Sequence, residues 1–421
     1  MRLLSMILLC VGLLCSTATA QTEQHWLVLT AASEGDPVVS SRAESRVRDA
    51  LSRQGADVWS PEAAATRFES EASAPATVLS ARELERWRSL SRAGVDELAE
   101  GNNQKALKKL NAALDISRDA IEELNRDPER ARVVFDTCLY VVRAVQSTES
   151  EARARSVARE CRQLVPRAEP SPYMHPPTVT NLLDSIDALQ AKQSGELVVE
   201  SEPPGCPARL NGVLLGETPV SIGEVFPGEY RVQVECDPGE RGRVHATTVG
   251  AGRTVRRVDT RFDEAIRSRP ALSLRYPSAS VAAEHRDADA RTIAREVGVD
   301  GAVVVSMSTP DTMELRLVDA KPPQNARPAA LALIPVDARG ASGTKLEAAA
   351  HTLTVAECTD FTTPEPTTLP CANDVITVAG PAESDWPAQR RPRGQFIAGL
   401  TLASVGIASL ATGYVLLVPL N

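Results

Sequence analysis

Aromatic residues are scarce in this chain, making up 4% of its 421 residues. Sugar-binding clefts and nucleic-acid stacking platforms both depend on aromatic rings, so the scarcity argues against both kinds of site. A formal net charge of −9 also disfavours nucleic acid and anionic lipid surfaces as partners. We therefore predict no nucleic-acid partner.

Signatures of catalysis and metal binding are missing too. The histidines lie in separate segments without a partner at metal-ligand spacing, which favours surface roles for all five: His25, His175, His245, His285 and His351. No serine stands in a GxSxG elbow, and Gly340–Lys345 lacks the spacing of a phosphate-binding loop, with Leu346 where a hydroxyl residue belongs. Carboxylate pairs on distant strands leave no such signature. We predict no catalytic, cofactor-binding or metal-binding residue and no enzyme activity.

The cysteines are few but informative. Cys10 and Cys15 lie in the apolar N-terminal segment, and the other six fall as three local pairs. Six cysteines permit many connectivities, but an oxidising compartment and this clustering favour sequential pairing. A zinc site would need closer pairs or accompanying histidines. The predicted disulfides, each contributing about 2–4 kcal/mol, are Cys138–Cys161, Cys206–Cys236 and Cys358–Cys371.

The N-terminus has the pattern of a secretory signal. Residues 1–20 contain Arg2, an apolar run and a small-x-small cleavage pattern at Ala18-Thr19-Ala20. Cys15 does not fit a lipoprotein signal, because Leu14 stands where lipid attachment requires a small residue. We predict an exported protein.

The C-terminus contains a candidate membrane helix. Residues 396–418 carry no charge and would span about 34 Å as a helix, which favours a transmembrane helix over a buried core helix or hairpin. Small residues share one face of it, so a second copy of the helix could approach there: Gly399, Ala403, Gly406 and Gly413. Topology stays open, because Arg390, Arg391 and Arg393 precede the helix on the side that the positive-inside rule disfavours.

Residues 195–234 contain turn residues at short intervals, which predicts a set of short strands. Leu197, Val199 and Ser201 alternate with Val198 and Glu200, the period of a half-buried strand. A proline-glycine turn ends that strand, Asn211-Gly212 marks a hairpin, and alternation resumes from Tyr230 to Val234. Four or five strands separated by such turns predict a small β-sandwich or barrel.

This pattern of strands and turn residues resembles the PEGA domain, a small β-module of bacterial envelope and signalling proteins. The matching positions are Gly195, Ser201, Pro203, Gly205, Asn211-Gly212, Gly216, Thr218-Pro219, Gly228 and Tyr230. The resemblance implies a noncatalytic module over residues 195–260. Pro204-Gly205-Cys206 departs from the family's usual acidic, glycine and alanine run, although the turn is retained.

The sequence before this module predicts a small α/β domain followed by a helical domain. Residues 21–75 give strand, helix and strand in a βαβ-like order, with the helix at Ser41–Gln54, and a linker follows Glu69. Residues 80–192 read as helices, and the small and large positions Ala93-Gly94, Gly101-Asn102, Ala106, Leu110, Ala113 and Leu114 resemble one tetratricopeptide repeat. Such a stack offers a groove for a peptide or serves as a spacer.

Residues 265–380 read as a second α/β domain, followed by a linker at 381–395. We expect a helix at Asp287–Val297, a hairpin turning at Thr309-Pro310-Asp311, and a strand at His351–Val355.

The predicted fold class is thus multidomain α+β with a C-terminal membrane helix. The predicted function is a noncatalytic, membrane-anchored scaffold of the bacterial cell envelope, with periplasmic domains that bind envelope proteins or cell-wall polymer. The alternative is an envelope enzyme or sensory receptor with an unrecognised site in an α/β domain.

Overall fold

The computed structural model describes residues 24–371 except 36, 38, 172, 322–329 and 338–339. The predicted signal peptide (1–20), the linker (381–395) and the membrane helix (396–418) lie outside the described residues. Among the residues that are described, none of the helices combines the length and the apolarity that crossing a bilayer requires.

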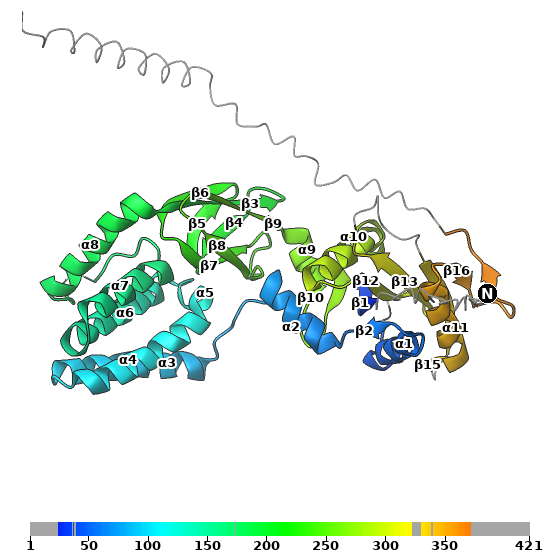
Figure 1. The fold of residues 1–421 in the computed structure, drawn as a ribbon, viewed down its shortest axis with the longest axis horizontal. Coiled ribbons are helices and arrows are strands. Elements are labelled where there is room, and N and C mark those ends of the chain that lie inside the picture. Colours follow the sequence, from blue (N-terminus) through cyan, green and yellow to red (C-terminus); the bar gives the residue numbers. More distant parts are fainter. Residues whose placement is uncertain are drawn as a thin grey trace, which may run out of the picture. The chain divides into compact units, whose positions relative to one another are not determined.

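A ten-stranded mixed sheet is built from both ends of the described chain (Figure 1). Its central order is β10–β11–β1–β12–β13–β14–β16–β17, with β2 beside β1 and β15 beside β14. The strands are β1 (His25–Ser33), β2 (Asp57–Val58), β10 (Ile266–Arg267), β11 (Ser273–Tyr276), β12 (Gly301–Thr309), β13 (Thr312–Asp319), β14 (Ala330–Asp337), β15 (Gly340–Ala341), β16 (Cys358–Asp360) and β17 (Thr367–Thr368).

The prediction of two separate α/β domains, at 21–75 and 265–380, is wrong. Strand β1 pairs in parallel with β12 through Trp26–Thr30 and with β11 through Thr30–Ser33. Its apolar residues are buried on both faces, as expected for a parallel strand in a sheet that is covered by a layer on each face. The local strand β2 is only two residues long, so β1 takes its main partners from the distant segment.

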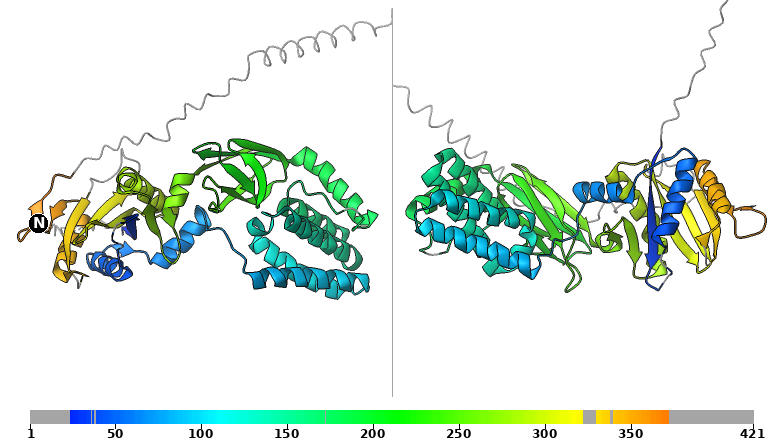
Figure 2. Two further views of the ribbon diagram at one scale, coloured as in Figure 1. Left: turned by 180° about the vertical axis from the view of Figure 1, so that it is seen from behind. Right: turned by 90° about the horizontal axis from the view of Figure 1, so that it is seen from below.

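Helices cover both faces of this sheet (Figure 2). Trp26 and Val28 point to the face that packs on α1 (Ser41–Arg53) and α11 (Gly343–Thr354). The alternate residues Leu27, Leu29 and Ala31 point to the other face, which packs on α2 (Pro61–Glu71), α9 (Thr260–Ala265) and α10 (Ala279–Val297). The period-two pattern of β1 therefore supplies both hydrophobic cores of the α/β domain.

Local expectations in this domain are partly met. The βαβ unit β1–α1–β2 is confirmed, as is the hairpin between β12 and β13. The strand expected at His351–Val355 is wrong, because this segment ends helix α11. The buried residues Leu346, Ala349, Ala350 and Leu353 recur at the spacing of a helix face.

The segment from 80 to 193 forms layered helices. They are α3 (Ala81–Ala99), α4 (Asn103–Asp119), α5 (Ile121–Leu124), α6 (Pro128–Thr148), α7 (Glu151–Leu164) and α8 (Pro177–Gln193). Helices α3 and α4 approach closely at Gly94, where an added Cβ would lie 2.5 Å from Cγ of Leu110. This fits the small residue expected there, although the resemblance to a tetratricopeptide repeat stays a prediction.

Helix boundaries differ from expectation at two places. The apolar stripe that includes Ile121 and Leu124 predicts one helix continuing to Leu124. The helix instead breaks at Ala120, so that α5 forms a separate turn. Thr148 and Glu151 have the spacing of a capping box and predict Thr148 as the cap of the next helix. Ser150 caps α7 instead, since its side chain accepts a hydrogen bond from the Arg153 amide. Asp127-Pro128 predicts the start of a helix, and this is confirmed, because Asp127 caps α6 and Pro128 is its first residue.

Residues 195–259 form the expected small β-sandwich. One sheet has the order β6–β3–β9 and the other β5–β4–β7–β8, with the hydrophobic core between them. The strands are β3 (Gly195–Glu202), β4 (Pro207–Leu210), β5 (Val213–Glu217), β6 (Val220–Val225), β7 (Gly228–Val234), β8 (His245–Val249) and β9 (Arg253–Asp259). Asn211 and Gly212 have φ of 48° and 84° and turn β4 into β5, as the sequence predicts.

The linker expected after Glu69 is shorter than predicted. Helix α2 continues to Glu71, and Ala74 then forms a β-bridge with Val244 of the sandwich. The chain therefore leaves the α/β domain already in contact with the β-module.

Candidate functional site

Helix α5 and the residues after it hold polar side chains in the interior. Glu122, Glu123 and Asn125 are 2%, 7% and 3% exposed. Burying such groups is unfavourable unless partners replace the lost water. Each of the three side chains has one such partner in the β-sandwich, namely Arg231, Arg241 and Asn211, so this segment forms the contact between the two parts.

Ion pairs cross this contact from both glutamates. Glu122 pairs with Arg231 of β7 and accepts a hydrogen bond of 3.2 Å from the Thr77 amide. Glu123 pairs with Arg241, which follows β7 in the sandwich, and lies 3.6 Å from Arg130 of α6. Each buried carboxylate is therefore neutralised by a guanidinium group.

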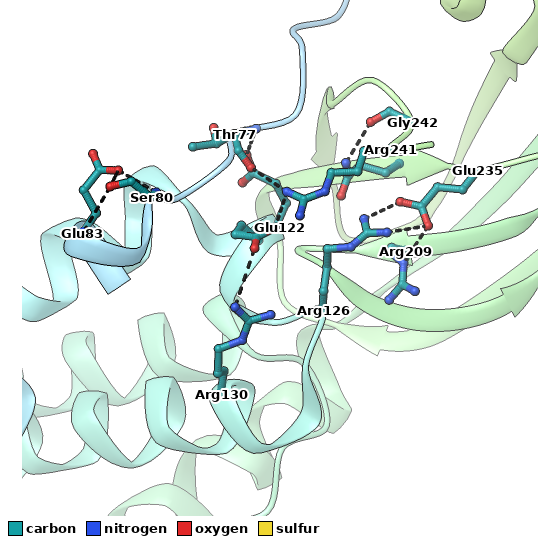
Figure 3. Close-up of polar contacts among 12 residues, drawn as sticks. Thr77, Ser80, Glu83, Glu122, Arg126, Arg130, Arg209, Glu235, Arg241 and Gly242 are labelled. Carbon is teal, nitrogen blue, oxygen red and sulfur yellow. Dashed lines mark hydrogen bonds and ion pairs between the residues drawn. The ribbon is translucent and has the colours of Figure 1, made fainter. Parts of the chain in front are cut away.

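A third carboxylate joins two arginines at the same contact (Figure 3). The Glu235 carboxylate accepts hydrogen bonds from both terminal nitrogens of Arg126, with Nη2 at 3.0 Å from Oε2. It also accepts one from Nε of Arg209 at 3.1 Å. The three side chains are 9%, 20% and 18% exposed respectively. This partly buried, bidentate geometry is the arrangement in which ion pairs are strongest.

The Asn211-Gly212 turn fits directly against α5. Asn125 donates to the Asn211 carbonyl at 2.8 Å, and the Asn211 side chain donates to the Gln163 carbonyl at 2.7 Å. A Cβ at Gly212 would lie 2.4 Å from the Glu122 carbonyl oxygen. We call this contact the α5 junction, made by Glu122, Glu123, Asn125 and Arg126 with Asn211, Gly212, Arg231, Glu235 and Arg241.

An apolar anchor accompanies the polar contacts. Phe226, between β6 and β7, is 3% exposed and belongs to the hydrophobic core of the helices rather than to that of the sandwich. The guanidinium of Arg159 lies 5.6 Å from its ring centroid. Besides the charge pairs of the α5 junction, the contact between the sandwich and the helices thus also buries a large ring.

The strand pattern and its turns agree with a known family. Residues 194–257 match the PEGA domain family. The match covers β3 through most of β9 and confirms the resemblance drawn from the turns. No curated protein and no solved structure matches the chain.

All three predicted disulfides are present: Cys138–Cys161, Cys206–Cys236 and Cys358–Cys371. The first joins α6 to α7, and the second lies within the PEGA module. Cys206–Cys236 links neighbouring strands rather than opposite edges of the core, because β4 and β7 pair directly through Ala208 and Val234.

The disulfides should differ in their sensitivity to reductant. Cys138 and Cys161 are both 0% exposed, whereas Cys236 is partly exposed and lines a cleft. Thiol exchange needs access to a sulfur atom. We expect limited reduction under native conditions, followed by alkylation and peptide mapping, to label Cys206 and Cys236 before Cys138 and Cys161. Simultaneous labelling of both pairs would contradict this order.

Two histidines expected at the surface are instead buried. The side chain of His175 is 1% exposed, and its Nε2 lies 2.9 Å from Oδ1 of Asp136. His245 is also buried and pairs with Asp263. Nothing in their sequence spacing signals this, because each partner lies on a different element. The described residues contain no group of three side chains that could hold a metal ion.

Asp136 anchors the proline-rich connector before α8. It accepts hydrogen bonds from the amide and hydroxyl of Ser171 as well as from His175. Burial acts to raise the pKa of Asp136, but the hydrogen bonds from His175 and Ser171 outweigh it and hold the pKa below its usual value. The charged carboxylate is therefore the stable form in the folded protein.

Asp136→Asn should lower stability at neutral pH and reduce its loss in acid. A carboxyl pKa that is lower in the folded state stabilises the protein above the unfolded-state pKa, and this contribution disappears as the pH falls through the folded-state value. We expect thermal unfolding between about pH 7 and pH 3 to show a shallower acid decline in the variant. Parallel curves for both proteins would show that ionisation of Asp136 does not contribute to the acid decline.

The helices have a groove between α3 and α6. It has a volume of about 610 Å³ and lies beside Trp87, with charged and apolar residues around it: Arg88, Ser91, Arg92, Asp127, Glu129, Arg130 and Val133. Val133 is 41% exposed. Among the described residues, neither Arg88 nor Arg92 has an ion-pair partner.

Proposed function

We propose that the protein is a noncatalytic, membrane-anchored scaffold of the bacterial cell envelope that binds another envelope protein. The three disulfides and the PEGA match support an extracellular or periplasmic location. In this proposal residues 1–20 direct export and residues 396–418 form the anchor. The PEGA module, fixed at the α5 junction, holds the helices as a rigid presenting surface.

The observation that carries the binding role is the groove between α3 and α6. Arg88 and Arg92 lie one helical turn apart at its rim, and in the described part of the chain neither forms an ion pair. Exposed Val133 adds an apolar contact beside them. The lining has three arginines against the two carboxylates of Asp127 and Glu129. In a chain of net charge −9, this local excess of arginine favours an acidic, extended segment of a partner protein.

Site-specific crosslinking in the native membrane tests this role. A photoreactive residue at Val133 of the full-length chain should give an adduct with an envelope protein, and Arg88→Glu together with Arg92→Glu should abolish it. The control places the same residue at Val355, which is 46% exposed and lies in the α/β domain. Failure to form an adduct at Val133, or an adduct that persists after both charge reversals, would overturn the assignment of the groove.

Anchoring needs its own experiment. Removing residues 396–421 should move the protein from the membrane fraction to the soluble exported fraction, with all three disulfides still formed. A truncated protein that remains in the membrane fraction would contradict an anchor at the C-terminus.

A further inference from the structure

A second buried polar contact joins the PEGA module to the α/β domain. His245 of β8 lies between Arg256 of β9 and Asp263 of α9. Nη2 of Arg256 is 2.6 Å from Nδ1 of His245, and Nε2 of His245 is 2.6 Å from Oδ2 of Asp263. The His245 and Asp263 side chains are 8% and 7% exposed. We call these three residues the His245 relay.

The chemistry of the relay determines the protonation state of His245. A guanidinium group only donates hydrogen bonds, so Nδ1 must accept from Arg256 and cannot carry a proton. Nε2 then carries the single proton and donates it to the Asp263 carboxylate. His245 is therefore neutral in this arrangement, and a second proton on Nδ1 would face the Arg256 cation directly.

Arg256 has little else to hold it in place. Its other hydrogen bond goes to the carbonyl of Ala72, just after α2, at 3.3 Å. Its Nε atom is buried without a hydrogen-bond partner among the described residues. Loss of the His245 contact would thus leave a single long bond between β9 and the segment that follows α2.

Charged groups of both signs surround the relay, and Glu264 lies beside Asp263 on α9. Arg243 is buried against Phe68 and donates to Ser73 and Ser268. Glu69 pairs with Arg269, and Arg267 donates to backbone carbonyls. The Asp263 carboxylate attracts both buried arginines electrostatically. Glu69 adds to this attraction at Arg243, and Glu296 adds to it at Arg256. A second proton on His245 would add to the buried cations without adding a carboxylate.

We propose that the His245 relay is a pH-sensitive latch between the PEGA module and the α/β domain. Protonation of His245 in mild acid displaces Arg256 from Nδ1 and so releases its contact with the Ala72 carbonyl. The neighbouring bridge, in which Ala74 and Val244 exchange hydrogen bonds of 2.9 and 2.7 Å, then opens more often. The contact closes again when the proton leaves.

Hydrogen exchange of the full-length protein measures this opening locally. At about pH 5, where histidines become charged, the amides of Ala74 and Val244 should lose protection about ten-fold relative to about pH 7.5, after correction for intrinsic exchange rates. In His245→Gln the amide retains one acceptor for Arg256 and one donor for Asp263 but cannot gain a proton, so protection should be the same at both pH values.

Two controls isolate His245 from the other histidines. His285→Gln, on α10, and His175→Gln, in the second buried pair, should retain the response of the natural protein. If His245→Gln fails to fold, Arg256→Gln provides a second test, because an amide there accepts from a protonated Nδ1 and removes the repulsion. The proposal would be overturned if acid-induced opening persists in whichever of His245→Gln and Arg256→Gln folds. It would also be overturned if the natural protein shows no acid-induced opening.

Discussion

Replacing Gly212 with alanine should lower the free energy of unfolding by about 2–4 kcal/mol. Two effects add at this position. The residue has φ of +84°, a conformation that L-residues rarely adopt, and the new Cβ would lie 2.4 Å from the carbonyl oxygen of Glu122. The contact is with backbone rather than with a flexible side chain, so relief requires the turn or α5 to move.

Gly205→Ala is the matched control for this substitution. Gly205 also lies in the PEGA module and has φ of +87°, but a Cβ added there would have nothing within 4 Å. It should therefore lose only the conformational part, about 1–2 kcal/mol. Urea unfolding of the two disulfide-intact variants gives both values. Equal losses would show that the close approach to Glu122 has no energetic effect.

Features set by neighbouring residues could be predicted from the sequence. The Asn211-Gly212 hairpin, the Asp127-Pro128 helix start and the β12–β13 hairpin all depend on local backbone preferences. The disulfide pairs also follow from short separations within one element pair. In each case the physical cause lies within a few residues, or within one pair of adjoining elements, and is visible in the sequence.

Features set by distant residues could not be predicted. Strand β1 resembles half of a local βαβ unit, and only its pairing with β12, far along the chain, shows that the two α/β segments are one domain. Glu122 and Glu123 look like ordinary solvated charges at a helix end. They are buried because Arg231 and Arg241 reach them from the β-sandwich, and a single sequence contains no sign of this.

The shared sheet explains why buried contacts are needed where the chain leaves and re-enters the α/β domain. The helices and the PEGA module occupy the chain between α2 and β10, inside the sequence of the α/β domain. The chain must therefore leave and re-enter the sheet, and the Ala74–Val244 bridge and Arg243 hold the departing segment. Because Arg243 also donates to Ser268, the departing and returning segments share one buried guanidinium.

Glu235→Ala should be among the most destabilising single changes at the α5 junction, with a loss of about 3–5 kcal/mol. It leaves Arg126 and Arg209 as partly buried cations without their shared carboxylate. Glu200→Ala is the matched control, because the Arg257 side chain of its pair is 76% exposed and the pair should contribute about 0–1 kcal/mol.

The loss at Glu235 should depend on the arginines that remain. Adding Arg126→Met and Arg209→Met to Glu235→Ala removes the uncompensated cations, so the triple variant should recover most of the lost free energy of unfolding. Urea unfolding of the single, triple and control variants measures this recovery. A triple variant less stable than Glu235→Ala would show that the arginines stabilise the junction through packing of their chains, and that the charge of Glu235 is not what holds the PEGA module on the helices.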